Sequence, residues 1–131
     1  YSEGYCFIEL IGEWNDCLNN DIMFLKREII DHLYKKGIRK FALFCDNVLN
    51  FHGSDNCYYE EWLEDIIEDG GWICLINIFE HVENEMLNTE LQHYVNFGGA
   101  FNDLNWRGKK PENLFLILDE MVKIQSNRLS Y

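Results

Sequence analysis

Basic residues are missing from the middle half of this sequence, and proline is almost absent. No Lys or Arg occurs between Phe41 and Trp106, whereas 13 of the 23 Asp and Glu residues fall in that stretch, and Pro111 is the single proline. All 11 basic residues lie outside it, so the formal net charge of −12 comes from one half of the chain. Because such an anionic surface repels phosphate backbones and anionic lipid headgroups, we expect neither a nucleic-acid partner nor a membrane partner.

Closely spaced cysteines and long apolar runs are also missing. The five cysteines contain no C-x-x-C pair, which disfavours a disulfide scaffold or a zinc ribbon and favours free thiols in a reducing compartment. No apolar run of about 18 residues and no signal peptide is visible. We therefore expect a cytoplasmic protein. The chain begins at Tyr1 rather than at Met, so this expectation concerns only residues 1–131.

Length and composition predict one α/β domain over residues 1–131, with a loose tail at residues 126–131. Apolar residues make up 47% and aromatic residues 15% of the 131 positions. That content is enough to close a hydrophobic core without disulfides.

Three apolar segments predict β-strands. Residues 6–14 alternate loosely between apolar and polar side chains, whereas residues 39–48 and 72–79 are almost continuously apolar at their centres. Continuous apolar runs are typical of strands that are buried on both faces, as in parallel sheets.

Helical spacing of apolar residues predicts helices between and after these strands. The first helix ends before Gly37, and the others cover residues 57–69, 83–97 and 111–125. The inward-facing residues of the first helix are predicted to be Leu18, Ile22, Leu25, Ile29 and Leu33, and those of the last are Leu114, Ile117, Leu118 and Met121. A fourth strand could lie in residues 100–107 or 114–118.

The element order is β-α-β-α-β-α-α. It predicts a small three-layer α/β/α sandwich with three to four mostly parallel strands and about four helices. This layout is similar to that of small flavodoxin-like or STAS-like domains. No sequence motif of either family is present, so the likeness extends to the layout and implies no function.

Polar side chains follow all three predicted strands. Because the carboxyl ends of parallel strands meet at one edge of a sheet, these side chains are expected to lie near one another. Carboxylates assisted by imidazoles bind divalent cations. The candidate metal ligands are Glu13, Asp46, His52, Asp55, Glu80 and His81. The alternative interpretation is that these residues are polar because they lie in loops or cap the helices that follow.

No phosphate-binding loop or zinc motif accompanies these candidates, and Cys45 has an acidic neighbour, which opposes formation of a thiolate. The leading hypothesis is a non-enzymatic, acidic interaction or regulatory domain that binds a protein partner or associates with itself. The alternative is a metal-binding or hydrolytic enzyme domain that uses the carboxylate and His cluster. An enzyme would gather these side chains in one pocket, whereas an interaction domain would expose an apolar patch beside the acids.

Overall fold

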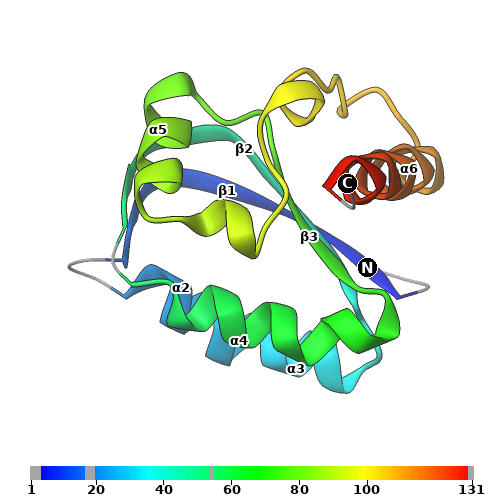
Figure 1. The fold of residues 1–131 in the computed structure, drawn as a ribbon, viewed down its shortest axis with the longest axis horizontal. Coiled ribbons are helices and arrows are strands. Elements are labelled where there is room, and N and C mark those ends of the chain that lie inside the picture. Colours follow the sequence, from blue (N-terminus) through cyan, green and yellow to red (C-terminus); the bar gives the residue numbers. More distant parts are fainter. Residues whose placement is uncertain (1–3, 17–19, 54, 130–131) are drawn as a thin grey trace.

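A three-stranded parallel sheet lies at the centre of the molecule (Figure 1). The computed structural model describes residues 4–16, 20–53 and 55–129. Strand β2 (Lys40–His52) lies between β1 (Tyr5–Asn15) and β3 (Trp72–Ile76), and it pairs in parallel with both neighbours.

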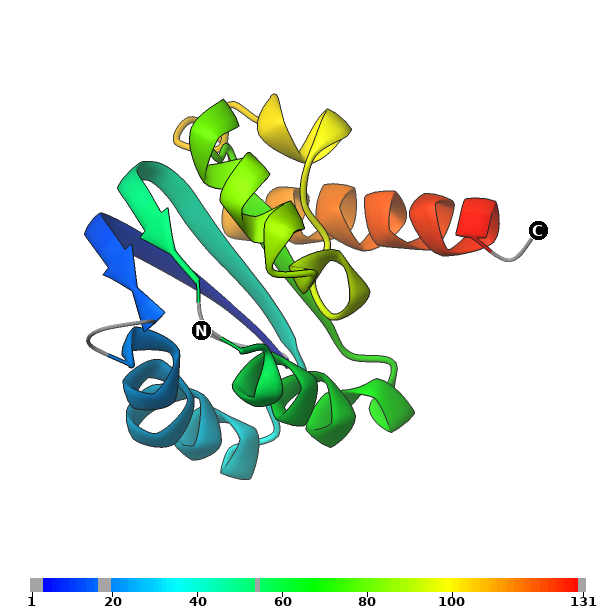
Figure 2. The same ribbon diagram turned by 60° about the vertical axis from the view of Figure 1, so that its left-hand side comes forward.

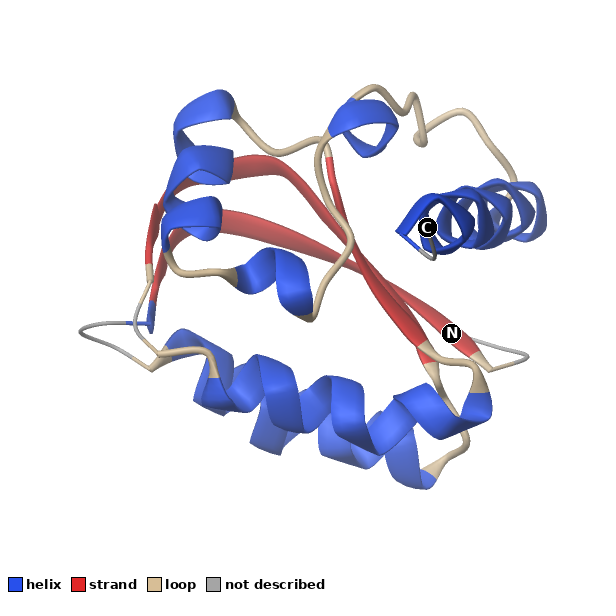
Figure 3. Cartoon of the chain, in the orientation of Figure 1, coloured by secondary structure: helices blue, strands red, loops and turns tan. Residues whose placement is uncertain are grey.

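Helices cover both faces of the sheet (Figure 3). The helices are α2 (Asp21–Leu25) and α3 (Asp31–Lys35), which a π-helical turn (Lys26–Ile30) joins, followed by α4 (Cys57–Ile66), α5 (Glu80–Asn88) and α6 (Pro111–Leu129). Short 3-10 turns occur at Ile67–Asp69, Leu91–His93 and Gly99–Asn102. Among the described residues, no helix combines the length and apolar character that a membrane span requires.

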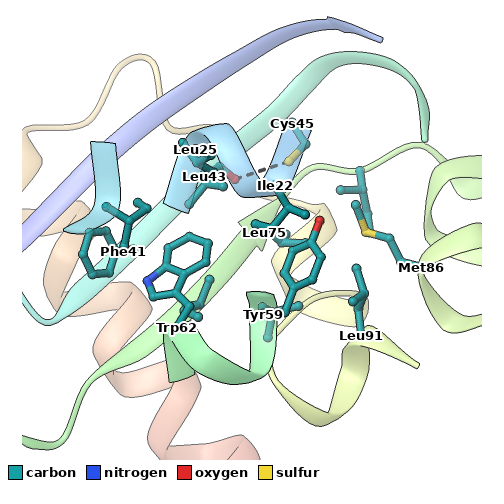
Figure 4. Close-up of a cluster of buried hydrophobic side chains, with 14 of the residues drawn as sticks. Ile22, Leu25, Phe41, Leu43, Cys45, Tyr59, Trp62, Leu75, Met86 and Leu91 are labelled. Carbon is teal, nitrogen blue, oxygen red and sulfur yellow. Dashed lines mark hydrogen bonds between the residues drawn. The ribbon is translucent and has the colours of Figure 1, made fainter. Parts of the chain in front are cut away.

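The side chains of β2 alternate between two cores. Phe41, Leu43 and Cys45 belong to the core that α2, α4 and α5 share, whereas Ala42 and Phe44 belong to the core beneath α6. Helix α4 supplies the largest side chains of the first core. Its Trp62 packs edge-to-face on Phe41 with 5.3 Å between ring centroids, and Tyr59 lies beside it (Figure 4). Burial on both sides explains the continuous apolar run that predicted this strand.

Strands β1 and β2 extend well beyond β3. Pairing between β2 and β3 covers residues 40–44 of β2, whereas pairing between β1 and β2 continues to Asn15 and His52 through two register shifts. We call residues 11–15 of β1 and 47–52 of β2 the ribbon. Its inner side packs on α5, because Val48 and Phe51 share the first core with Val82 and Met86 of that helix.

The π-helical turn corrects the predicted face of the first helix. Ile30 is buried with 1% of its surface exposed, whereas Ile29, predicted to face inward, is 44% exposed. A π-helical turn places one extra residue in the helix and therefore shifts the inward face by one position. The predicted Leu18 lies outside the described residues.

Other differences occur at the ends of elements. Strand β3 stops at Ile76 because Asn77 adopts a left-handed conformation with φ of 59°. Helix α5 begins and ends earlier than predicted, since Glu90 (φ 62°) breaks the segment before a 3-10 turn. Residues 100–107 form no strand, residues 114–118 are helical, and the backbone of residues 126–129 continues α6 where a loose tail was expected.

Helix α6 attaches to the sheet through few groups. Leu114 and Leu118 are buried, and Phe115 stacks on Tyr5 with 4.4 Å between centroids. Asp119 accepts hydrogen bonds from Lys40 (2.8 Å) and from the Trp72 indole (3.0 Å). Ile117, predicted to face inward, is 37% exposed instead.

A buried lysine joins α2–α3 to α4. Lys26 is 1% exposed, and its ammonium contacts Asp31, Asp65 (3.0 Å) and Glu61 (3.6 Å). Burial opposes the charge on Lys26, but the hydrogen bonds to Asp31 and Asp65 outweigh that cost and raise its pKa above the ordinary value. The ion cluster therefore holds the ammonium in a position that is shielded from water.

We expect Lys26→Met to lower the free energy of unfolding by about 1–3 kcal/mol, because three carboxylates lose their shared cation. Urea denaturation measures the change. The matched control is Arg27→Met, since Arg27 contacts two of the same carboxylates but its side chain is 48% exposed. The control should change stability by less than about 1 kcal/mol. Equal losses in the two variants would show that the buried position is unimportant.

Asp119 should make stability depend on pH. Burial acts to raise its pKa, but hydrogen bonds from Lys40, Trp72 and Lys123 outweigh burial and lower it from 3.8 to about 2. A carboxyl whose pKa is lowered on folding stabilises the folded state at pH values above its ordinary pKa. This contribution is lost as the pH falls through the pKa that the carboxyl has in the folded state. Asp119→Asn should therefore cost about 1–3 kcal/mol at neutral pH and progressively less as the pH falls from about 4 to about 2. Denaturation at several pH values, with the exposed Glu112→Gln as control, measures this. A difference that persists unchanged at pH 2 would contradict it.

Candidate functional site

Asp46, just beyond the part of β2 that pairs with β3, holds the loop that precedes α6. One carboxylate oxygen accepts a hydrogen bond from the Asn77 amide at 3.0 Å, and the other accepts one from the Trp106 indole at 2.9 Å. Trp106 in turn stacks on Phe44 with 4.1 Å between centroids. Both oxygens of this candidate metal ligand are thus engaged by neutral donors from two later segments.

Asn77 extends this network. Its side chain donates to the Leu104 carbonyl at 2.7 Å and accepts from the Leu104 amide at 3.0 Å, which reproduces the pairing of a neighbouring strand. Asn102 adds a second link, accepting from the Ile78 amide at 3.1 Å and donating to Glu83. These bonds position residues 101–106, and the sequence signal for them is Asn77, a polar residue within the apolar run 72–79.

The other candidate ligands lie apart in separate contacts. Glu13 accepts from the Asn50 amide (3.3 Å), Asp55 accepts from the Cys57 amide (3.1 Å) at the start of α4, and His81 contacts the Leu49 carbonyl at 2.6 Å.

The two remaining candidates are His52, which ends β2, and Glu80, which begins α5 and is exposed. Within the described ranges, no three His, Cys, Asp or Glu side chains are grouped closely enough to hold a metal ion. The metal hypothesis therefore stays a prediction.

A buried carboxyl that the sequence interpretation missed lies at the start of the first helix. Asp16, 1% exposed, accepts hydrogen bonds from the Tyr59 hydroxyl (2.7 Å) and the Ile22 amide (2.8 Å). Burial raises the pKa of Asp16, and burial beside this carboxyl raises that of Tyr59 well above its ordinary value. The Trp14 indole completes the chain by donating to Tyr59 at 3.2 Å. Asp16 thus ties β1 to α2 and α4.

An apolar cavity beneath these groups is too small for a substrate. It has a volume of about 20 Å³ and is lined by side chains such as Leu43, Cys45 and Met86. That space suits about one water molecule. Burial raises the pKa of Cys45 to about 12, so its thiol is protonated at neutral pH and is a poor nucleophile. Neither the cavity nor the thiol supports a catalytic role.

The outer side of the ribbon exposes large apolar residues between polar pairs. Ile11 is 77% exposed and Leu49 is 56% exposed. Asn47 bonds Glu9 at 3.2 Å on one side of them, and Asn50 bonds Glu13 on the other.

His81 links a third exposed apolar side chain to Leu49. Phe79 is 42% exposed and stacks on His81, the residue that contacts the Leu49 carbonyl. We call Ile11, Leu49 and Phe79 the ribbon patch. Apolar groups that share a surface with acids are typical of an interaction site.

No protein-family model and no curated protein sequence matches this chain. Solved structures do match it. The anti-sigma factor antagonist SpoIIAA in its unphosphorylated form matches with a TM-score of 0.59 and 11% identity, covering 75% of this chain and 83% of that one. The Bacillus cell fate determinant SpoIIAA in its phosphorylated form matches with a TM-score of 0.51 and 10% identity, covering 75% and 86%. A putative anti-sigma factor antagonist from Thermotoga maritima matches with a TM-score of 0.58 and 21% identity, covering 73% and 80%.

The chain has a STAS-like fold. This likeness, together with the sheet order, confirms the predicted α/β class, the parallel strands and the helices on both faces. Of the two layouts expected from the element order, the STAS-like one matches solved structures. At 21% identity or less, the likeness shows the fold alone.

We expect Asp46→Asn to destabilise the chelator-treated STAS-like domain by about 1–3 kcal/mol, because the new amide presents a donor to a donor. Thermal melting measures the change. Asp103→Asn, an exposed substitution in the loop that Asp46 holds, is the control and should leave the melting temperature unchanged.

The same assay tests the metal hypothesis. If Mg²⁺, Ca²⁺, Mn²⁺ or Zn²⁺ raised the melting temperature of the wild type but not that of Asp46→Asn and Glu80→Gln, these carboxylates would be ligands and the structural role of Asp46 would be secondary.

Proposed function

We propose that this chain is a regulatory domain that acts by binding a protein partner rather than by catalysis. The ribbon patch is the observation that carries the proposal. A Leu and an Ile exposed at 56% and 77% on the outer side of a sheet lose solvent-exposed apolar area only when another surface covers them. Four of the six candidate metal ligands, by contrast, serve in hydrogen bonds within the fold, namely Glu13, Asp46, Asp55 and His81.

The structural neighbours support a regulatory role. SpoIIAA and the Thermotoga maritima protein are described as anti-sigma factor antagonists, names that define them by an effect on another protein. A shared fold at low identity transfers no partner, but it agrees with an interaction role. The free thiols Cys6, Cys45 and Cys74 are buried, which agrees with the reducing environment of the cytoplasm, where we place this domain.

Charge defines the partner. Glu9 and Glu13 flank Ile11 on β1, and Glu80 follows Phe79 at the start of α5. Basic side chains lie at one end of this surface: Arg107 is 2.8 Å from Glu9 and lies over Trp106, and Lys109 lines the same pocket as Glu9. An acidic rim around apolar residues suits a basic segment with apolar side chains of its own, because opposite charges speed the encounter and exclude acidic competitors.

The test places a photo-crosslinking amino acid at position 49 of the full chain in cells that express it. We expect a covalent adduct with one basic protein, identified by mass spectrometry. The matched control places the same group at Phe24, which is 54% exposed on α2, a helix that packs on the face of the sheet opposite the outer side of the ribbon. The captured protein, once purified, should bind Ile11→Ser/Leu49→Ser at least about tenfold more weakly than the wild type or Phe24→Ser.

Two results would refute the proposal. One is an adduct pattern at position 49 that equals the pattern at position 24. The other is a captured protein whose affinity for the double variant matches its affinity for the wild type. Because both substituted residues are exposed, the variant should keep the wild-type melting temperature, which separates lost binding from lost folding.

A further inference from the structure

Helix α6 has apolar residues on two sides, but the sheet covers only one of them. Eight of the eleven residues from Leu114 to Ile124 are apolar. Leu114 and Leu118 are buried against the sheet, whereas Leu116 is 63% exposed and Ile124 is 46% exposed on the other side. A helix that is apolar all round is normally buried all round.

The exposed side of α6 forms one continuous stripe. Residues three, four and seven apart lie on one face of a helix, so Ile117 and Ile124 are in line with Glu120 between them and Leu116 beside them. Lys123 is exposed next to Leu116 at the edge of this face, and its ammonium also contacts Asp119 at 3.2 Å. We call these five residues the α6 stripe. The carboxyl-terminal end of α6, drawn red, extends past the sheet and the other helices (Figure 2).

We propose that the α6 stripe pairs with the same stripe of a second copy of this chain, in an antiparallel helix pair. A two-fold axis near Glu120 brings Ile117 of each helix against Ile124 of the other, because these residues lie about equally far on either side of the axis. Leu116 then packs on the aliphatic stem of the second copy's Lys123. The two Glu120 side chains then lie opposite each other at the axis, and at a rise of about 1.5 Å per residue each lies about 4.5 Å along the helix from Lys123 of the second copy.

Charge complementarity favours a second copy over a basic partner. The stripe carries one acid and one base, so it has no net charge, and in the inverted pair the two Lys123 ammonium groups flank the two Glu120 carboxylates that meet at the axis. The acidic residues of α4 lie on the opposite face of the sheet from α6, so two copies paired through α6 keep these acids apart (Figure 1). With a net charge of −12 on each chain, a neutral stripe is where two copies can meet at the least electrostatic cost. One helix from each chain makes a small interface, so the association should be weak.

Sedimentation equilibrium of the full chain, from micromolar to near-millimolar concentration, tests the proposal. We expect a monomer–dimer equilibrium in the wild type. Leu116→Glu should weaken it at least about tenfold, because a carboxylate replaces an apolar contact. The matched control, Phe24→Glu, introduces the same charge at an apolar residue that is 54% exposed elsewhere and should leave the equilibrium unchanged. Circular dichroism and melting confirm that each variant is folded.

A charge exchange identifies the second copy as the occupant. Glu120→Lys places like charges opposite Lys123, and Lys123→Glu places like charges opposite Glu120, so each variant alone should associate more weakly than the wild type. An equimolar mixture of the two should associate at least as tightly as the wild type, since opposite charges then face each other at both contacts. No partner other than a second copy gives this restoration.

A wild type that stays monomeric at the highest concentration would overturn the proposal. A mixture that associates no better than its two components would also overturn it. The outcome is independent of the proposed partner site, because Ile11→Ser/Leu49→Ser should leave the dimer intact and Leu116→Glu should leave the ribbon patch intact.

Discussion

The difference in length between β2 and β3 is the constraint on which the rest of the structure depends. Strand β2 has 13 residues and β3 has 5, so the second half of β2 has a neighbour strand on one side. Backbone groups on the open side need other partners. The Leu49 carbonyl contacts the His81 ring. The side chain of Asp46, in the same part of β2, accepts hydrogen bonds from Asn77 and Trp106. Helix α5, through His81, and the loop before α6, through Trp106, thus supply contacts along the part of β2 that β3 does not reach. Helix α6 covers the amino-terminal half of the sheet, and the outer side of the ribbon stays open.

The strands and the last helix could be predicted from apolar patterns, because burial on both faces of β2 and β3 requires continuous apolar runs. The inward-facing sides of β1 and of the first helix could not be predicted from these patterns, and the reason is the same for both elements. Each contains two adjacent large aliphatic residues, Leu10–Ile11 and Ile29–Ile30, of which one must face outward. Periodicity alone does not say which. A register shift in β1 and a π-helical turn after α2 decide it, and neither has a signature in a single sequence.

The candidate metal ligands illustrate a different limit. Their position at the carboxyl end of the sheet followed from parallel pairing, but parallel pairing fixes only the edge. The directions of the side chains depend on donors that come from later in the chain, such as the indole of Trp106. In a segment without Lys or Arg between positions 41 and 106, carboxylates that converged without a metal would repel one another. Neutral amide and indole donors satisfy Asp46 without bringing a second charge to the site, which is the arrangement that costs least when no metal is bound.

The uneven charge of the chain gives its two exposed apolar surfaces opposite responses to salt. The ribbon patch has an acidic rim, so its attraction for a basic partner weakens as ions screen the charges. The α6 stripe is neutral, and at a net charge of −12 the main electrostatic term between two copies is repulsion of the whole molecules. Screening reduces that repulsion, so added salt should favour self-association while it disfavours partner binding. Ionic strength thus distinguishes binding at the ribbon patch from self-association through α6 without any substitution. At low salt, a domain of this composition is most available to a basic partner and associates least with itself.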